Sequence, residues 1–234
     1  CLDNLIALGK KKGISFSVHA LDGINLGEKI DRIRECSVMI LAEALKIAEY
    51  IEAKWVTVHL GIAGFSSKDR EKKWKRLNLV IQSLNQAIQI SETTKVKLAV
   101  ENLYQYSSEK AKSKLGDSPE EIAYVLNNVL EQDRVAFLCD VGHANILTSI
   151  EKMMNQYCNG FNEAIIAAHV HFNNGVEDTH ESLEKYEVEC KPVLSYLYDI
   201  YRRGGILVFE SYSLDENMES RKIVENAFIK FRNA

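Results

Sequence analysis

Histidine and carboxylate side chains follow short apolar runs throughout the chain. Nine of them stand where such a run ends or just beyond it: His19, His59, Glu101, Asp140, His143, His171, Asp178, His180 and Glu210. A charged group beside a buried strand is costly unless it is paired or bound to a cation. Because no lysine or arginine occupies the same strand ends, this set would repel itself without cations between its members. The residues therefore predict a metal site.

The types of ligand narrow the choice of metal. Imidazole together with carboxylate, and without cysteine, favours zinc, manganese or iron over copper(I), and the imidazole content argues against calcium or magnesium. At about four or five ligands per ion, counting waters and a bridging carboxylate, the nine residues would serve two or three ions. We expect zinc, with manganese as the alternative.

Each of these residues also has a structural interpretation when it is taken alone. A single histidine after a strand is more often a hydrogen-bonded structural residue, and Glu101 or Glu210 could be an ordinary strand-end carboxylate. The joint occurrence of nine such residues favours the metal site. His169 is the exception: it lies two residues before His171, on the same face of the strand but deeper, and we expect it to be a hydrogen-bonded core residue that supports the site.

The elements that would position these residues alternate between strand and helix. Apolar, β-branched runs typical of strands span residues 14–20, 55–61, 96–102, 135–141, 164–173 and 205–211. Amphipathic helical patterns span residues 29–53, 68–91, 119–131, 192–203 and 217–231. This alternation predicts parallel strands joined by right-handed crossovers, with the carboxyl ends of the strands at one face.

We predict an α/β fold of the TIM (β/α) barrel class, in one domain that spans residues 1–234. A closed barrel of this class has eight strands, and six of the eight β/α units are visible. The chain opens at Cys1 on an amphipathic segment typical of the end of a helix. We therefore expect the N-terminal units to be missing from this sequence, with a six-stranded open barrel as the alternative.

The bulk composition excludes several classes of protein. The chain is 46% hydrophobic and 26% charged, with a formal charge of −4, which offers no bulk argument for nucleic-acid binding. No stretch approaches the ~18–20 apolar residues of a membrane span. The five cysteines form no CxxC pair, which argues against a disulfide framework or a structural zinc knuckle and indicates the cytoplasm.

Two segments could nevertheless contact a phosphate backbone. A basic run opens the helix after His59: Lys68, Arg70, Lys72, Lys73, Lys75 and Arg76. The long loop after Glu101 contains Tyr104, Tyr106, Lys110, Lys112 and Lys114. Since that loop follows a strand, it could overhang the site and contact phosphate or stack on a base. The alternatives are a solvated helix face, because Asp69 and Glu71 dilute the run, and an ordinary flexible lid.

In the order of these motifs the chain resembles the superfamily of apurinic/apyrimidinic endonuclease IV and the xylose isomerase-like sugar phosphate isomerases. The resemblance runs from about residue 2 to residue 212. In the endonuclease branch nine side chains hold three zinc ions, and each has a match here. The resemblance implies three groups of ligands: His19, His59 and Glu101; Glu101, Asp140, His171 and Glu210; and His143, Asp178 and His180. Glu101 would bridge the first two metals.

The chain departs from the nuclease pattern in places. After the first histidine the nuclease has Ala-Pro-Tyr, where the tyrosine helps to distort DNA, whereas this chain has Ala20-Leu21-Asp22. The family's His-Leu-Asn-Asp is His-Phe-Asn-Asn at residues 171–174, and the loop from there to Asp178 is short, as in isomerase-like relatives. These differences leave the metal ligands in place and weaken the case for a DNA substrate.

Two enzymatic interpretations follow. In phosphoester hydrolysis, one metal-bound water with a pKa lowered to about 7 supplies hydroxide while other ions polarise the phosphoryl oxygens. Glu101 would then set the spacing between metals, and Glu210 or Asp140 would orient the water. In isomerisation or epimerisation of a sugar or sugar phosphate, one or two metals grip neighbouring oxygens and Glu101 or Glu210 moves the proton.

We favour hydrolysis, because isomerase chemistry does not require all nine ligands. The expected substrate contains phosphate, either DNA with an abasic site or a small sugar phosphate, and the isomerase branch implies that an oligomer is possible. A metal-binding protein without catalysis is the third interpretation, and it would leave no coordination position open.

Overall fold

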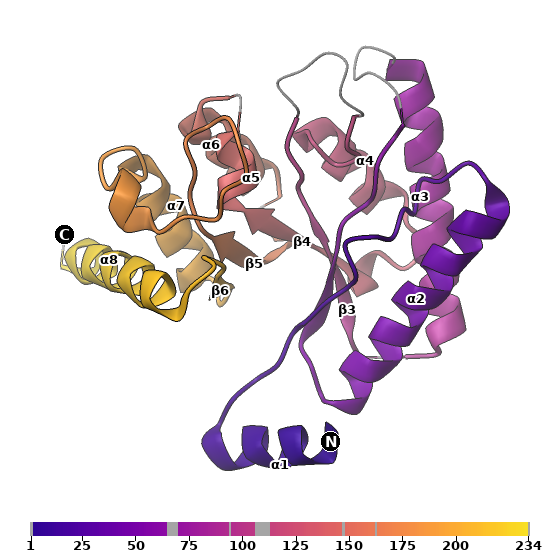
Figure 1. Ribbon diagram of the computed structural model, residues 1–234, viewed down its shortest axis with the longest axis horizontal. Helices are drawn as coiled ribbons and strands as arrows, with labels where there is room; N and C mark the ends of the chain where they lie inside the picture. Colours follow the sequence, from indigo (N-terminus) through magenta and orange to yellow (C-terminus); the bar gives the residue numbers. More distant parts are fainter. Residues whose placement is uncertain are drawn as a thin grey trace. The chain divides into compact units, whose positions relative to one another are not determined.

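The computed structural model describes residues 2–64, 70–93, 95–105, 113–146, 148–161 and 163–233. Helices and strands alternate along the chain (Figure 1). The described residues form six strands, and the strands that pair are parallel to each other. This is the α/β architecture of an incomplete TIM (β/α) barrel, as the sequence predicts.

The chain divides into two compact units. Unit 1 comprises Cys1–Glu101, Glu109–Gly116 and Glu120–Ala136. Unit 2 comprises Asn102–Ser108, Asp117–Pro119 and Phe137–Ala234. The single domain expected from the sequence stays a prediction.

Unit 1 is built on the first three strands and the helices between them. Its elements are α1 (Leu2–Lys12), β1 (Val18–His19), α2 (Asp31–Tyr50), β2 (Trp55–Val58), α3 (Arg70–Ser91), β3 (Lys97–Glu101), most of α4 (Pro119–Asn128) and η1 (Gln132–Arg134). His19 lies opposite Thr57, and Val58 lies opposite Val100. All of β2 is buried, and α2 packs against α3. The three strands therefore end side by side.

Unit 2 repeats this arrangement with the last three strands. Its elements are most of β4 (Val135–Asp140), α5 (Val141–Asn145), α6 (Ile150–Gly160), β5 (Ile165–Val170), η2 (Leu183–Tyr186), α7 (Lys191–Arg202), β6 (Ile206–Phe209) and α8 (Leu214–Arg232). Asp140 lies opposite His169, and Val170 lies opposite Phe209. The register brings the carboxyl ends of these strands to one edge, beside Glu210.

The structure differs from the sequence prediction in the length of β1 and in two short helices. β1 has two residues instead of the span 14–20, because Ile14 N bonds back to Gly9 O to close the turn after α1 and pairing with β2 begins only at Val18. The short helices α5 and α6 were not predicted. α5 has only five residues, too few for a helical period, but Ser149 caps α6 and was a readable start signal.

None of the helices formed by the described residues has both the length and the apolar character of a membrane span.

Candidate metal centre

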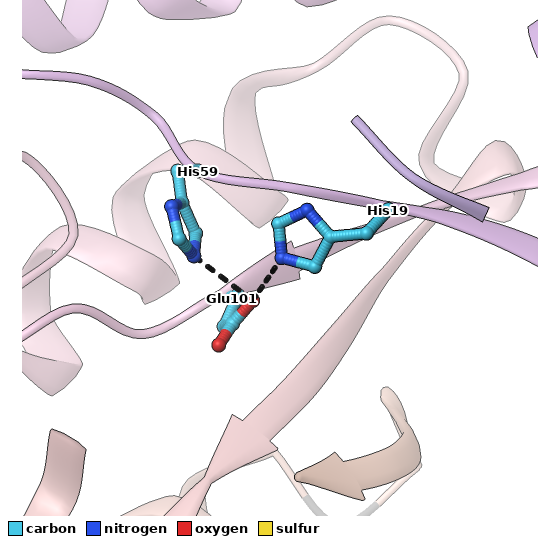
Figure 2. Close-up of side chains that lie close together, drawn as sticks. All are labelled: His19, His59 and Glu101. Carbon is cyan, nitrogen blue, oxygen red and sulfur yellow. Dashed lines mark hydrogen bonds and ion pairs between the residues drawn. The ribbon is translucent and has the colours of Figure 1, made fainter. Parts of the chain in front are cut away.

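Three adjacent strand ends build a compact group in unit 1. His19 ends β1, His59 follows β2 and Glu101 ends β3, and the three side chains point toward one another (Figure 2). His19 Nε2 lies 3.3 Å and His59 Nε2 lies 3.1 Å from the same carboxylate oxygen, Glu101 Oε2. Their ligand atoms all lie within 4.8 Å of one another, a separation that suits ligands of one ion.

The other ring nitrogens determine what these imidazoles can do. His19 Nδ1 lies 2.7 Å from Ala20 O, and a carbonyl oxygen only accepts hydrogen bonds, so Nδ1 carries the proton. The neutral ring then directs the lone pair of Nε2 at Glu101, an arrangement that is repulsive unless a proton or a cation lies between them. His59 Nδ1 faces Asp22 Oδ1 at 3.4 Å, so Nε2 of this ring is likewise directed at Glu101. The group fits a divalent metal.

A second group, in unit 2, has the same arrangement of histidine and carboxylate side chains. His143 Nε2 lies 3.1 Å and His180 Nε2 3.5 Å from Asp178 Oδ2. Both Nδ1 atoms face backbone carbonyls, that of His143 at 2.8 Å from Asn102 O and that of His180 at 2.9 Å from Glu210 O. In its neutral form, each ring in this orientation would turn a lone pair toward the carboxylate, as a metal ligand does.

Protons compensate for these contacts when no cation is present. Burial raises the pKa of Asp178, but hydrogen bonds from His143 and His180, with the charges of the neighbouring histidines, outweigh it and hold that pKa well below its usual value. The hydrogen bond to Asp178 raises the pKa of His180 to about 9, against the opposing effect of burial. A bound cation would replace the proton that this pair otherwise keeps.

His171 is fully buried in unit 2 and connects two sets of ligands. Its side chain is fully buried, with Nε2 3.1 Å from Asp140 Oδ2, and it forms a candidate ligand group with His180 and Glu210. Its Nδ1 lies 4.0 Å from Asp178 Oδ1, and both atoms are buried without a hydrogen-bond partner among the described residues. Two such atoms facing each other fit an ion between them.

Glycine at position 142 makes room for this ring. A Cβ at Gly142 would lie 2.0 Å from His171 Cε1, so any side chain there would displace the imidazole. Asp140 at the start of α5 accepts a 2.6 Å hydrogen bond from His143 N through Oδ1, which leaves Oδ2 for His171. The backbone of α5 thus fixes the ring and the carboxylate together.

Two supporting residues complete the arrangement in unit 2. Asn102 donates from Nδ2 to Asp140 O at 3.0 Å and accepts from Asp140 N at 2.8 Å, while its own carbonyl holds His143. Asn102 is a functional residue that the strand-end pattern of histidines and carboxylates does not include, although an amide directly after Glu101 at a strand end is a usable signal. His169 is buried, as expected, and its Nδ1 lies 3.0 Å from Glu210 Oε2.

The nine predicted residues are thus divided between the two units: three lie together in unit 1 and six lie in unit 2. The basic run is engaged in local pairs: Arg70 with Glu120, Lys73 with Glu121, Lys75 with Glu71, and Arg76 with Gly27 O. Those pairs favour the structural interpretation of that helix face.

The loop after Glu101 is described only in part. Tyr104 packs against the ring of His143 at 5.1 Å, and Lys114 forms an isolated bridge with Ile62. Several residues of the two segments that could contact phosphate lie outside the described residues: Lys68, Asp69, Tyr106, Lys110 and Lys112.

Known proteins with similar sequences and structures agree with this fold. The family model described as "Xylose isomerase-like TIM barrel" matches residues 2–225. The uncharacterized protein MJ1311 of Methanocaldococcus jannaschii is 22% identical over 231 residues, which cover 94% of this chain and 72% of that protein.

Solved structures with similar folds come from both branches of the superfamily. A D-tagatose 3-epimerase-like protein has a TM-score of 0.82 at 20% identity, covering 99% of this chain and 84% of its own. Endonuclease IV from Thermus thermophilus has a TM-score of 0.74 at 18% identity, covering 98% and 81%.

Proposed function

Because the chain belongs to the xylose isomerase-like TIM barrel family, we propose that it is a metal-dependent enzyme whose histidine and carboxylate groups bind two or three divalent ions, zinc in first place and manganese as the alternative. One observation carries the proposal. In both units, histidines whose Nδ1 faces an acceptor turn Nε2 toward a carboxylate oxygen. Neutral imidazole and carboxylate in that geometry form a zinc-ligand set.

We propose hydrolysis of a phosphoester as the reaction. Zinc supplies Lewis acidity and an activated water for attack on a phosphoryl group. The carboxylates differ in what they can reach: the side chain of Asp140 is fully buried and that of Glu101 is 2% exposed, whereas Glu210 is 26% exposed. Glu210 is therefore the candidate that orients the attacking water, while Asp140 and Glu101 hold metals.

The backbone of Glu210 supports this role. Its carbonyl accepts from His180 Nδ1 at 2.9 Å, and its Oε2 lies 3.0 Å from His169 Nδ1. The carboxylate is thus fixed at one oxygen and can accept a proton at the other. The substrate we propose carries a phosphate group, as DNA with an abasic site or a sugar phosphate does.

A second candidate is isomerisation or epimerisation of a sugar or sugar phosphate. It is favoured by Asp22, which lies 3.4 Å from His59 where the nuclease pattern has the tyrosine that distorts DNA. The fold likeness to a D-tagatose 3-epimerase-like protein supports it too. Glu210, with His169 beside it, would then move the proton.

The deciding experiment counts metals per chain and assays two substrates. The wild-type protein and the variants Glu101→Ala and His180→Ala would be tested with a duplex that contains an abasic site and with D-tagatose, with Glu35→Ala on the exposed surface of α2 as the control. Hydrolysis predicts close to three zinc ions, strand cleavage, and loss of activity in both variants.

Other results would point elsewhere. One or two ions with intact DNA and a converted sugar, only weakened by His180→Ala, would establish the isomerase instead. Metal bound tightly without turnover of either substrate would support a metal-binding protein, and a protein that retains no metal would overturn the proposal.

We also propose a cytoplasmic location, because Cys36, Cys158 and Cys190 carry free thiols. Burial raises the pKa of Cys158 to about 11, so that thiol stays protonated and inert at neutral pH.

A further inference from the structure

A column of three rings leads from the buried ligands of unit 2 to the solvent. The imidazole of His171, which is fully buried, stacks on His180 with centroids 3.8 Å apart and planes 5° apart. The other neighbour of His180 is Tyr212, at 5.2 Å and 29°. Tyr212 is 80% exposed. The column therefore ends in an aromatic ring that borders a ligand histidine and faces water.

The backbone on both sides of this tyrosine is fixed. Glu210 O is held by His180 Nδ1, while Asn217 accepts from Ser211 N at 2.7 Å and donates to Ser211 O at 3.1 Å. Directly after Tyr212, Ser213 caps α8 by accepting from Glu216 N. The backbone that carries the ring is therefore held in place, and the contact with His180 orients the ring, which reduces the ordering entropy lost on binding.

Position distinguishes Tyr212 from an ordinary surface aromatic. Exposed single apolar residues are common and need no function. Here one part of the ring packs on His180, whose Nε2 faces Asp178, and the rest is open to solvent beside the same group of ligands. A flat aromatic surface stacks on the face of a ring, so it favours ligands that contain a ring over ligands that do not.

We propose that Tyr212 is a specificity-determining residue that stacks on the sugar ring of the substrate while the adjacent histidine and carboxylate groups engage the substrate's oxygen atoms. The inference rests on the proposed function, since it takes these groups as the reaction centre. The sugar ring is the chemistry common to both candidate substrates, and it can belong to an abasic nucleotide in DNA or to a free sugar.

The test measures binding to the zinc-loaded protein by titration calorimetry. The probes are a duplex with a tetrahydrofuran abasic site, D-tagatose, and inorganic phosphate, which binds metal but has no ring. The variants are Tyr212→Ala, Tyr212→Phe, and Leu214→Ala as the control, because Leu214 is a neighbouring side chain that is 76% exposed.

Tyr212→Ala should lower the affinity for the sugar-containing probe about tenfold, as expected for the loss of one stacking contact. Tyr212→Phe and Leu214→Ala should stay within about twofold, and the zinc content and phosphate affinity should not change. The probe that responds, duplex or free sugar, identifies the source of the ring.

Three results would overturn the inference. Unchanged sugar affinity in Tyr212→Ala shows that the ring does not contact the substrate. An equal loss for phosphate shows that Tyr212 only supports His180. Failure of the zinc-loaded wild-type protein to bind either sugar probe removes the ligand class. A wild-type protein without zinc refutes the proposed function itself, and is distinguished from these results by the metal count.

Discussion

The ligand groups of unit 1 and unit 2 share one arrangement, in which histidine Nε2 faces a carboxylate oxygen. They differ in burial and in the acceptors that orient the histidines. In unit 1 the side chain of His19 is 36% exposed, and the acceptor at His59 Nδ1 is the carboxylate of Asp22, which is 80% exposed. In unit 2 the side chains of Asp140 and His171 are completely buried. The acceptors at Nδ1 of His143 and His180 are both backbone carbonyls, which cannot rotate away, whereas in unit 1 His19 has such an acceptor and His59 does not.

This difference has a consequence for metal affinity. Residues that orient ligand histidines commonly change affinity by about 10–100-fold, and burial strengthens every interaction between the ion and its ligands. We therefore expect the ions of unit 2 to be held tightly and the ion of unit 1 to exchange readily. A readily exchanged ion leaves room for water and substrate oxygens.

The largest effect should come from Gly142→Ala. The added Cβ would lie 2.0 Å from His171 Cε1, in a region where neither the buried ring nor the α5 backbone can yield. Overpacking of this kind costs about 1–3 kcal/mol of unfolding free energy. We expect that loss in chemical denaturation, together with loss of the ion bound by His171.

Gly160→Ala is the matched control for that experiment. Gly160 lies in α6 of the same unit, and a Cβ there would meet nothing within 4 Å. Alanine in a helix should leave stability unchanged or raise it by up to about 1 kcal/mol. Equal behaviour of the two variants would show that His171 has no close backbone neighbour in solution.

Asn102→Ala should have the next largest effect. The change removes both side-chain bonds to the backbone of Asp140, at 2.8 and 3.0 Å, although the carbonyl that holds His143 remains. The zinc affinity of unit 2 should fall about 10–100-fold, measured by competition with a chelator in a His19→Ala background that disables the ion of unit 1.

Asn128→Ala provides the reference, because among the described residues Asn128 bonds to Tyr124 O within the exposed last turn of α4. An Asn102→Ala protein with wild-type affinity would mean that Asp140 is positioned without the amide, and the contrast between the units would lose its main physical cause.

Strand ends were among the parts of this molecule that the sequence could predict. A strand buried on both faces leaves a continuous apolar run, and the polar residue after it must point out of the carboxyl edge; β2 and β4 follow that rule closely. His19, His59 and Glu101 were found in this way, without knowledge of their distances. Asp140 ends β4 by the same regularity, but its position opposite His169 depends on a register shift between Phe137 and Leu138 that the sequence does not reveal.

Contacts made through loops could not be predicted, because no period encodes them. The stack of Tyr212 on His180 joins residues from two loops, and the bond from His180 to Glu210 O depends on a positive φ of 48° at His180. The space for His171 depends on a missing side chain at Gly142. Each requires coordinates, since sequence spacing carries no information about it.

The smallest expected effect is that of Asp22→Asn, and it tests the comparison from the side of unit 1. Asp22 Oδ1 lies 3.4 Å from His59 Nδ1 and 3.8 Å from His19 Nδ1, with most of the carboxylate in water. Exposed charge pairs contribute little, so zinc affinity of unit 1, read in a His143→Ala background, should fall by less than about fivefold. The amide oxygen can still accept from His59, which isolates the charge as the variable. A fall as large as that of Asn102→Ala would show that exposure does not weaken this support. The difference in zinc affinity between unit 1 and unit 2 would then have to come from the number of ligands instead.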